Sequence, residues 1–279
     1  MDRYVVAGNP VEHSQSPFIH AEFANQTGQV MAYGRHLCPL DGFAESMRAL
    51  AAGGARGCNV TVPFKFEAFR QGRHPTPRAA LAEAANVLCF HADGWLADNT
   101  DGAGLVNDLE KNAGVPLAGR RLLLIGAGGA AAGVLGPLLA ARPAVLVVAN
   151  RSVDKALALV ERHRSVAGAA RLDAAPLDAC GAGYDVVINA SASSLQRAGV
   201  PVAPATLAPG ALALDTMYGP AAQGFLGWAA AHGAIGRDGL GMLVEQAAAA
   251  FELWRGVRPD TAPVLSALRA RMAAKRSAP

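Results

Sequence analysis

The stretch RRLLLIGAGGAA, from Arg120 to Ala131, decides the fold of this chain. Its apolar run, Leu122–Ile125, predicts a short strand that is buried on both faces of a sheet. Three glycines, Gly126, Gly128 and Gly129, follow the run and lead into small residues that can begin a helix. A strand, a glycine-rich turn and a helix in this order are typical of a unit that binds the pyrophosphate of a dinucleotide.

We expect each of the small residues of this turn to have its own structural role. Gly126 allows a tight turn, Gly128 lets backbone N–H groups approach a pyrophosphate, and Ala131 is small enough for the helix to pack on the strand. An ordinary glycine-rich turn of an α/β protein is the alternative for this pattern taken by itself. The residues that we expect to line a cofactor here are Gly126, Ala127, Gly128, Gly129 and Ala130.

A cation follows the next apolar run, Ala144–Ala149. Units that bind NAD usually have Asp or Glu here, which accepts hydrogen bonds from the ribose 2′-OH. This chain instead has Asn150, Arg151 and Ser152, and Lys155 lies one helical turn later. The guanidinium of Arg151 can hold a 2′-phosphate through paired hydrogen bonds. The sequence therefore predicts NADP rather than NAD, against the alternative that Arg151 is a solvated residue at a strand end.

Composition and length limit the class of protein. The 279 residues are 52% hydrophobic and 17% charged, which predicts an ordered chain long enough for two domains. The net charge of +3 is too small to indicate a nucleic-acid partner. Four scattered cysteines predict neither a disulfide framework nor a metal site. The N-terminus does not resemble a signal peptide, and glycines interrupt the longest uncharged stretch, so we expect a cytoplasmic protein without a membrane segment.

Strands alternate with helices along the chain, which predicts an α/β fold with parallel sheets. The strands we expect are Tyr4–Ala7, Met31–Cys38, Gly57–Val62, Leu122–Ile125, Ala144–Ala149, Arg171–Leu172, Tyr184–Asn189 and Ala211–Asp215, with a hairpin of Asn86–Phe90 and Trp95–Asp98 around a D-G turn. The helices we expect are 17–28, 43–51, 78–85, 103–112, 155–163, 222–232, 242–255 and a last one from Pro263.

Polar side chains near strand ends and helix starts are candidates for chemistry. Ser14 and Ser16 are two residues apart, so in extended chain their hydroxyls point to one side and could hold a small carboxylate beside a helix N-terminus. The alternative for Ser16 is a plain N-cap. Lys65 follows a strand end, although alone it could be a surface charge, and Asp101 could simply favour the start of a helix.

Seven motifs in this order resemble those of the shikimate dehydrogenase family and span essentially the whole chain: HSQSP, NVTVPFK, Asn86, NTDG, GAGGAA, NRS and GLGMLVEQAA. The resemblance implies a substrate-binding and catalytic α/β domain, residues 1–101 and 240–279, to which the C-terminal helices return. It also implies a Rossmann-type doubly wound parallel-sheet NADP domain, residues 102–239, with the active site in the cleft between the domains.

The same resemblance implies an oxidoreductase that reversibly reduces 3-dehydroshikimate to shikimate with NADPH, in chorismate and aromatic amino-acid biosynthesis. Its partner would be a small-molecule substrate, without nucleic acid, membrane or metal, and the protein would be a monomer or homodimer. Two alternatives stay open: a quinate/shikimate dehydrogenase that uses NAD, and a non-catalytic NADP-binding regulator on this fold.

Individual roles follow by resemblance. Ser14 and Ser16 would bind the shikimate carboxylate. Lys65 and Asp101 would form the catalytic pair, because a lysine ammonium can protonate the alkoxide that forms at a reduced carbonyl. Residues implied to contact the substrate are Thr61, Lys65, Asn86, Asp101, Tyr218 and Gln246, and those implied at the nicotinamide end are Thr216 and Gly239.

The chain departs from the family pattern at four places, one of which is Pro77, where the family frequently has an acidic residue. Val87 stands where the family usually has Thr, which we expect to remove a hydroxyl near the substrate ring. The loop Asn189–Ser194 reads NASASS instead of N-A-T-S-S-G, and Thr216 replaces a frequent Met. The last two changes leave the cofactor contacts of this region open.

Overall fold

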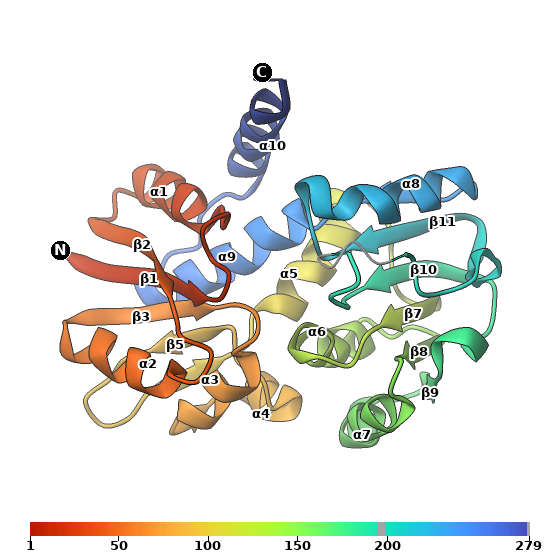
Figure 1. Cartoon of the computed structure of the whole chain (residues 1–279), viewed down its shortest axis with the longest axis horizontal. Helices are drawn as coiled ribbons and strands as arrows, with labels where there is room; N and C mark the ends of the chain where they lie inside the picture. Colours follow the sequence, from red (N-terminus) through yellow and green to blue (C-terminus); the bar gives the residue numbers. More distant parts are fainter. Residues whose placement is uncertain (195–198, 278–279) are drawn as a thin grey trace. The chain divides into compact units, whose positions relative to one another are not determined.

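The computed structural model describes residues 1–194 and 199–277 and divides into two compact units (Figure 1). Met1–Gly104 and Leu243–Pro279 form the first unit, and Leu105–Met242 form the second. In the described residues each unit contains one six-stranded sheet. No helix of this described part is long and apolar enough to cross a membrane.

The first unit is an α/β layer structure whose sheet has the strand order β2-β1-β3-β5-β6-β4. Its elements are β1 (Asp2–Gly8), α1 (Ser16–Thr27), β2 (Met31–Leu37), α2 (Phe43–Ala52), β3 (Ala55–Val60), α3 (Lys65–Gln71), β4 (His74–Pro75), α4 (Pro77–Ala82), β5 (Val87–Cys89), β6 (Leu96–Asp98), the start of α5 (Asp101–Asn107), most of α9 (Leu240–Arg255) and α10 (Ala262–Ser277).

This sheet is mixed, so the expectation of parallel sheets throughout is wrong for the first unit. β1 runs parallel to β2 and β3, whereas β5 is antiparallel to both β3 and β6. The cause is the predicted hairpin, which is confirmed: a short turn can join only antiparallel strands. The predicted helix 78–85 is shorter in the structure, since α4 ends at Ala82. The backbone of Glu83 has a left-handed conformation, and the Ala85 N–H donates to the Lys65 carbonyl instead of continuing the helix.

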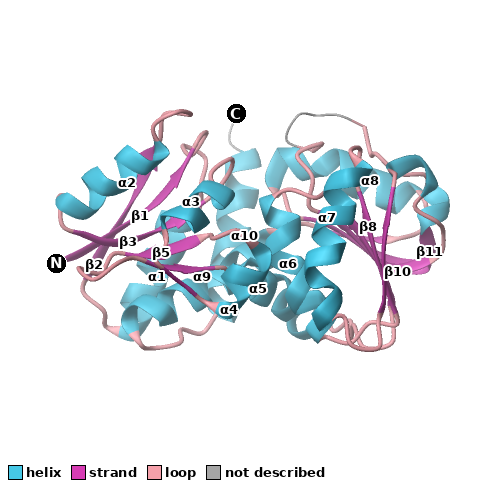
Figure 2. Ribbon diagram, turned by 90° about the horizontal axis from the view of Figure 1, so that it is seen from below, coloured by secondary structure: helices cyan, strands magenta, loops and turns pink. Residues whose placement is uncertain are grey.

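Strand β3 shows how the first unit separates its core from its polar residues. Cys58 and Val60 face one side, where Phe43 of α2 and Ala68 of α3 bury them. Asn59 alternates to the opposite face, toward α1. Figure 2 shows helices on both sides of this sheet. One strand therefore contributes both to the apolar core and to a polar cluster behind it.

The second unit is a doubly wound, all-parallel sheet with the order β12-β11-β10-β7-β8-β9. Read from β9, this is the 3-2-1-4-5-6 strand order of dinucleotide-binding folds. The order in which successive strands are added reverses between β7 and β10. Its elements are β7 (Arg121–Ile125), α6 (Gly129–Ala140), β8 (Val145–Ala149), α7 (Val153–His163), β9 (Arg171–Ala175), β10 (Tyr184–Asn189), β11 (Leu207–Asp215), α8 (Gln223–Ala231) and β12 (Ile235–Arg237).

Two features of the second unit were not predicted. Strand β12 has only three residues and an exposed Ile235, so it carries no apolar run that sequence could show. The predicted helix 103–112 instead begins at Asp101 and widens into a π-helix over Asp108–Asn112. The fully buried Asp108 of this segment accepts hydrogen bonds from Arg237 at 2.5 and 2.8 Å. A Cβ at Gly241 would lie 1.7 Å from an Asp108 oxygen, so the residue there must be glycine.

We predict that Arg237→Met lowers the free energy of unfolding by about 3–5 kcal/mol, because it leaves the Asp108 carboxylate buried without a cation. Urea unfolding followed by circular dichroism measures this change. Removing both charges, with Asp108→Leu and Arg237→Met together, should recover much of the loss. The matched control is Arg171→Ala, which breaks an exposed pair with Asp173 and should cost under about 1 kcal/mol. Equal losses for the two single variants would contradict the prediction.

Candidate active site

Two helix starts in the first unit bring a cation and a carboxylate together. Lys65 is the first residue of α3 and Asp101 is the first residue of α5. Lys65 Nζ donates to Asp101 Oδ2 at 2.5 Å, and the side chains are only 13% and 6% exposed. A partly dehydrated ammonium held this way can exchange a proton with a group bound beside it. The structure thus places the two residues of the expected catalytic pair in direct contact.

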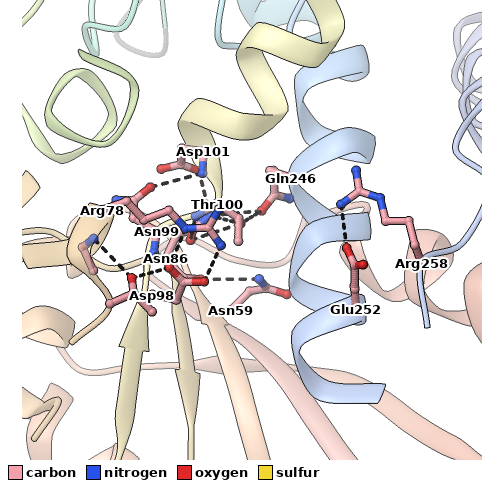
Figure 3. Close-up of polar contacts among 12 residues, drawn as sticks. Asn59, Arg78, Asn86, Asp98, Asn99, Thr100, Asp101, Gln246, Glu252 and Arg258 are labelled. Atoms are coloured by element: carbon pink, nitrogen blue, oxygen red, sulfur yellow. Dashed lines mark hydrogen bonds and ion pairs between the residues drawn. The ribbon is translucent and has the colours of Figure 1, made fainter. Parts of the chain in front are cut away.

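The amide of Asn86 joins this pair to the C-terminal helices. Its Nδ2 donates toward Asp101 Oδ1 at 2.8 Å, Thr100 Oγ1 at 3.0 Å and Gln246 Oε1 at 3.1 Å (Figure 3). Its Oδ1 accepts from the Thr100 N–H at 2.8 Å. The structure therefore gathers Lys65, Asn86, Asp101 and Gln246, as expected, and adds Thr100. Thr100 lies inside the NTDG motif, so its hydroxyl is the signal in the sequence for this additional member of the cluster.

The turn that carries Asp101 is anchored by an ion pair that nothing in the sequence predicted. Arg78 donates to both oxygens of the buried Asp98, at 2.7 and 2.5 Å, and Thr76 Oγ1 donates at 2.6 Å. Asn99 then accepts from the Asp101 N–H at 3.1 Å. Burial raises the pKa of Asp98, but the hydrogen bonds from Arg78 and Thr76 outweigh it, so the pKa lies below its ordinary value.

The serine pair lies at the start of α1, although not as a cap. Ser16 is already the first helical residue, Gln15 occupies the N-cap position, and no side chain caps the helix. The alternative that Ser16 is an N-cap is therefore wrong. Ser14 Oγ donates to Ser16 Oγ at 3.2 Å and accepts from the Ser16 N–H at 3.3 Å. The two hydroxyls face each other beside the N-terminus of a helix, which favours an anion through its open N–H groups and its dipole.

Thr61 and Val87 are two further positions of the first unit that the sequence singled out, and their surroundings differ from each other. Thr61 is half-buried after the end of β3, and its N–H donates to the Ala7 carbonyl. The side chain of Val87 is fully buried in an apolar cluster with Cys89 and Ala250. Strand alternation turns this side chain into the core while Asn86 faces the polar site, so the expected loss of a hydroxyl near the substrate ring stays a prediction.

The glycine turn after β7 has the geometry that a pyrophosphate needs. Gly126 has φ +111°, and a Cβ there would lie 3.1 Å from backbone atoms of Ala190, so only glycine fits. Gly128 is the N-cap of α6, which begins at Gly129, and no side chain occupies the cap. Open backbone N–H groups at the start of this 12-residue helix favour an anion.

The predicted phosphate-binding residues lie at the end of β8 and the start of α7. Arg151, Ser152 and Lys155 are exposed, and among the described residues Arg151 forms no ion pair. The Asn150 side chain donates to the Ser152 carbonyl at 2.9 Å, which fixes the turn between strand and helix. These residues fit the phosphate ester of NADP, because a guanidinium and an ammonium are available there for an anion.

Thr216 and Gly239 hold the strand ends of the second unit together. Thr216 Oγ1 donates to the Asn189 carbonyl at 3.0 Å. A Cβ at Gly239 would lie 2.3 Å from the Thr216 carbonyl oxygen, so the two backbones touch. Tyr218 is half-buried just after β11, in the second unit. In the described residues no three His, Cys, Asp or Glu side chains could together hold a metal ion.

The altered loop after β10 is a hydroxyl network. Ser191 Oγ donates to Asn189 Oδ1 at 2.7 Å, and the Ser191 and Ser193 hydroxyls are 2.8 Å apart. Ser194 donates to the buried Asp215, which also accepts from Asn189 Nδ2 at 3.1 Å. Burial raises the pKa of Asp215. The serines of NASASS thus fold the loop back onto the ends of β10 and β11.

Comparisons with known proteins agree on one family. Family models described as the shikimate dehydrogenase substrate binding domain, shikimate/quinate 5-dehydrogenase and the shikimate 5'-dehydrogenase C-terminal domain match residues 6–88, 108–199 and 239–269. A curated shikimate dehydrogenase (NADP(+)) from Methylibium petroleiphilum is 66% identical over 96% of this chain and 94% of its own.

Solved structures with the same fold include two close matches. A shikimate 5-dehydrogenase from Thermus thermophilus in complex with NADP(H) and shikimate has a TM-score of 0.84 and 31% identity, over 97% of this chain and 99% of that one. An Ael1 enzyme from Pseudomonas putida has a TM-score of 0.85 and 42% identity, over 96% and 98%. The expected α/β fold, with a substrate-binding part and a doubly wound part, is confirmed.

We predict that Asp98 stabilises the protein only above its ordinary pKa. Its pKa is lowered by folding, so its contribution is complete above about pH 3.8 and is lost as the pH falls through the lower folded-state value. Replacing Asp98 with Asn should therefore reduce the free energy of unfolding most near neutral pH. The difference from the wild type should shrink below about pH 3.8. Urea titrations at several pH values measure it, and a difference that does not change with pH would refute the assignment.

Proposed function

The chain belongs to the shikimate dehydrogenase family, and we propose that it catalyses the reversible, NADPH-dependent reduction of 3-dehydroshikimate to shikimate. This reaction would serve chorismate and aromatic amino-acid biosynthesis in the cytoplasm, in a monomer or homodimer. The observation that carries the proposal is the contact of 2.5 Å between Lys65 and Asp101 beside the Asn86 amide. A regulator that only binds NADP would have no need for a buried cation and carboxylate at this place.

Lys65 would be the proton carrier of the reaction. NADPH, when bound, supplies a hydride to the carbonyl carbon. The Lys65 ammonium gives a proton from Nζ to the oxygen that becomes a hydroxyl, and in the oxidative direction Nζ takes this proton back. Asp101 keeps the ammonium oriented and compensates its charge, while Asn86 fixes Asp101. Buried groups that are already in place stabilise the developing negative charge without reorganising.

Neutral donors would bind the rest of the substrate. The hydroxyls of Ser14 and Ser16, with the N-terminus of the 12-residue helix α1, suit the carboxylate of a small cyclic acid. Amides and hydroxyls, which both donate and accept, suit ring hydroxyls. We assign these ring contacts to Thr61, Asn86, Tyr218 and Gln246. The substrate domain would comprise residues 1–101 and 240–279.

The cofactor would lie on the second unit, and we propose a cofactor domain of residues 102–239. Supporting this are the left-handed Gly126 and the uncapped start of α6, which suit a pyrophosphate together with Ala127, Gly128, Gly129 and Ala130. The exposed Arg151 and Lys155, with Asn150 and Ser152, would hold the 2′-phosphate. Thr216 and Gly239 would lie at the nicotinamide end.

An assay of four combinations of substrate and cofactor tests the proposed function directly. Shikimate and quinate are each offered with NADP and with NAD, and the absorbance of the reduced nicotinamide is followed. We expect turnover largely confined to shikimate with NADP. Efficient turnover with quinate or NAD would make the protein a quinate/shikimate dehydrogenase of dual specificity. Cofactor binding without any turnover would make it a regulator.

We predict that Lys65→Ala lowers kcat by roughly 10²- to 10⁴-fold, the usual contribution of a positioned proton donor. Shikimate binding, measured by calorimetry, should change little, because Ser14 and Ser16 remain. The matched control is Lys111→Ala at the exposed end of the π-helix, which should leave kcat unchanged. Normal turnover in Lys65→Ala would exclude Lys65 as the proton carrier.

We predict that Arg151→Ala raises the KM for NADP by roughly 10- to 100-fold, as expected for a lost charge-assisted hydrogen bond. The KM for NAD, which has no 2′-phosphate, should hardly change. Arg164→Ala removes an exposed arginine near the far end of α7 and serves as control. An equal effect of Arg151→Ala on both cofactors would contradict the 2′-phosphate role.

A further inference from the structure

A buried carboxylate at the end of β11 has no role in the reaction described so far. Asp215 is the last residue of β11, and its side chain is fully buried. Its Oδ1 accepts from the Met217 N–H at 2.8 Å, and its Oδ2 accepts from Asn189 Nδ2 at 3.1 Å and from the Ser194 hydroxyl. All three donors are neutral, and none of the ion pairs formed by the described residues includes Asp215. Hydrogen bonds therefore hold this carboxylate, but no cation neutralises it.

The hydrogen bonds around Asp215 suit an ionised carboxylate. The Met217 N–H can only donate. The amide of Asn189 is held with its NH₂ group toward Asp215, because its Oδ1 accepts from the Ser191 N–H at 3.2 Å and from the Ser191 hydroxyl at 2.7 Å. Each carboxylate oxygen thus faces a group that must donate, and an ionised carboxyl group only accepts. Burial raises the pKa of Asp215 and the three hydrogen bonds oppose this shift, as expected for a charge that no cation neutralises.

This carboxylate lies against the backbone that we assign to the nicotinamide end of the cofactor. Thr216 follows Asp215 directly, and the Met217 carbonyl accepts from the Gly239 N–H at 2.9 Å. A Cβ at Gly239 would lie 2.3 Å from the Thr216 carbonyl oxygen, so no side chain separates these two segments. A ring bound at Thr216 and Gly239 would have only this backbone between itself and the Asp215 carboxylate.

The oxidised and reduced forms of a nicotinamide cofactor differ in the charge of the ring. The oxidised ring is positively charged and the reduced ring is neutral, whereas the phosphates and riboses are the same. A carboxylate behind the ring therefore attracts the oxidised form alone. Over a separation of about 8 Å, and with the screening usual inside proteins, this attraction predicts roughly 5- to 30-fold tighter binding of the oxidised form.

We propose that the charge of Asp215 shifts the preference of the cofactor site in the second unit from NADPH toward NADP⁺. When the ring gives up its hydride to the carbonyl carbon, it gains a positive charge, and Asp215 stabilises that charge without moving. The proton for the carbonyl oxygen still comes from Lys65, so Asp215 takes part in no bond change. The inference deepens the proposed function and rests on it, because it requires the nicotinamide ring to lie beside Thr216 and Gly239.

The test compares the binding of the two redox forms to Asp215→Asn, which removes the charge and keeps the size of the side chain. We expect the Kd for NADP⁺ to rise roughly 5- to 30-fold and the Kd for NADPH to stay within about twofold of the wild-type value. Calorimetry measures the Kd for NADP⁺, and the fluorescence of the reduced ring measures the Kd for NADPH.

One control variant and one control ligand show whether the effect comes from the charge and from the ring. The matched variant is Asp185→Asn, because Asp185 lies near the opposite end of the strand that carries Asn189 and is paired with Arg120. This variant should leave both Kd values unchanged. The ligand is 2′-phospho-ADP-ribose, which has no nicotinamide and should bind Asp215→Asn as tightly as it binds the wild type.

A measurement on the unaltered protein covers the case in which Asp215→Asn does not fold. Because the coupling between two sites is reciprocal, the cationic ring must lower the proton affinity of Asp215 by the same roughly 5- to 30-fold. The titration of the Asp215 carboxyl, followed by carbon NMR, should therefore have its midpoint at lower pH in the NADP⁺ complex than in the NADPH complex. Equal midpoints would overturn the inference.

The binding data separate the inference from the proposed function. If the Kd values for NADP⁺ and NADPH change by the same factor in Asp215→Asn, or if neither changes, the role of Asp215 is refuted and the cofactor site stands. A loss of 2′-phospho-ADP-ribose binding as large as the loss of NADP⁺ binding also refutes it, because the ring is then not involved. If the unaltered protein binds neither NADP⁺ nor NADPH, the proposed function is wrong and the role of Asp215 falls with it.

Discussion

The ion pair between Lys65 and Asp101 is the interaction on which the arrangement of the first unit depends. A carboxylate only 6% exposed is stable when a cation and further donors compensate its lost hydration, and here Lys65 and Asn86 supply them. This contact requires the starts of α3 and α5 to lie side by side. A second buried pair, Arg78 with Asp98, holds the turn before Asp101 in place. Lys65 and Asp101 therefore stand on helix starts that other interactions hold in place.

The same unit uses the two faces of single strands for different purposes. On β3, Cys58 and Val60 build the apolar core while Asn59 enters the polar cluster with His20 and Tyr33. Immediately before β5, Asn86 faces the polar site, and Val87 packs against Ala250. Neighbouring side chains in a strand point in opposite directions. Core residues and residues of the polar site are therefore adjacent in sequence but lie on opposite faces of the sheet.

In the second unit the constraint is the close approach of backbones. Gly126 lies against Ala190, Gly239 against the Thr216 carbonyl and Gly241 against the Asp108 carboxylate, and a Cβ would collide at each position. Gly126 and Gly239 allow the close approach of backbone at the ends of β7, β10 and β11, and the strand order reverses between β7 and β10. In doubly wound sheets this is where nucleotides bind.

The sequence by itself determined most of the strands and helices and the family to which the chain belongs. Continuous apolar runs such as Leu122–Ile125 predicted the buried strands, the D-G turn predicted the β5–β6 hairpin, and spaced motifs carried the family. These signals are local, because they depend on the spacing of apolar side chains along the sequence and on the residues that form turns. Only the tertiary structure decided which distant groups meet. Asn86 Nδ2 donates to Gln246 Oε1 across 160 residues of sequence, and Arg78 pairs with Asp98. Such pairs depend on strand register and helix packing, which no local pattern encodes.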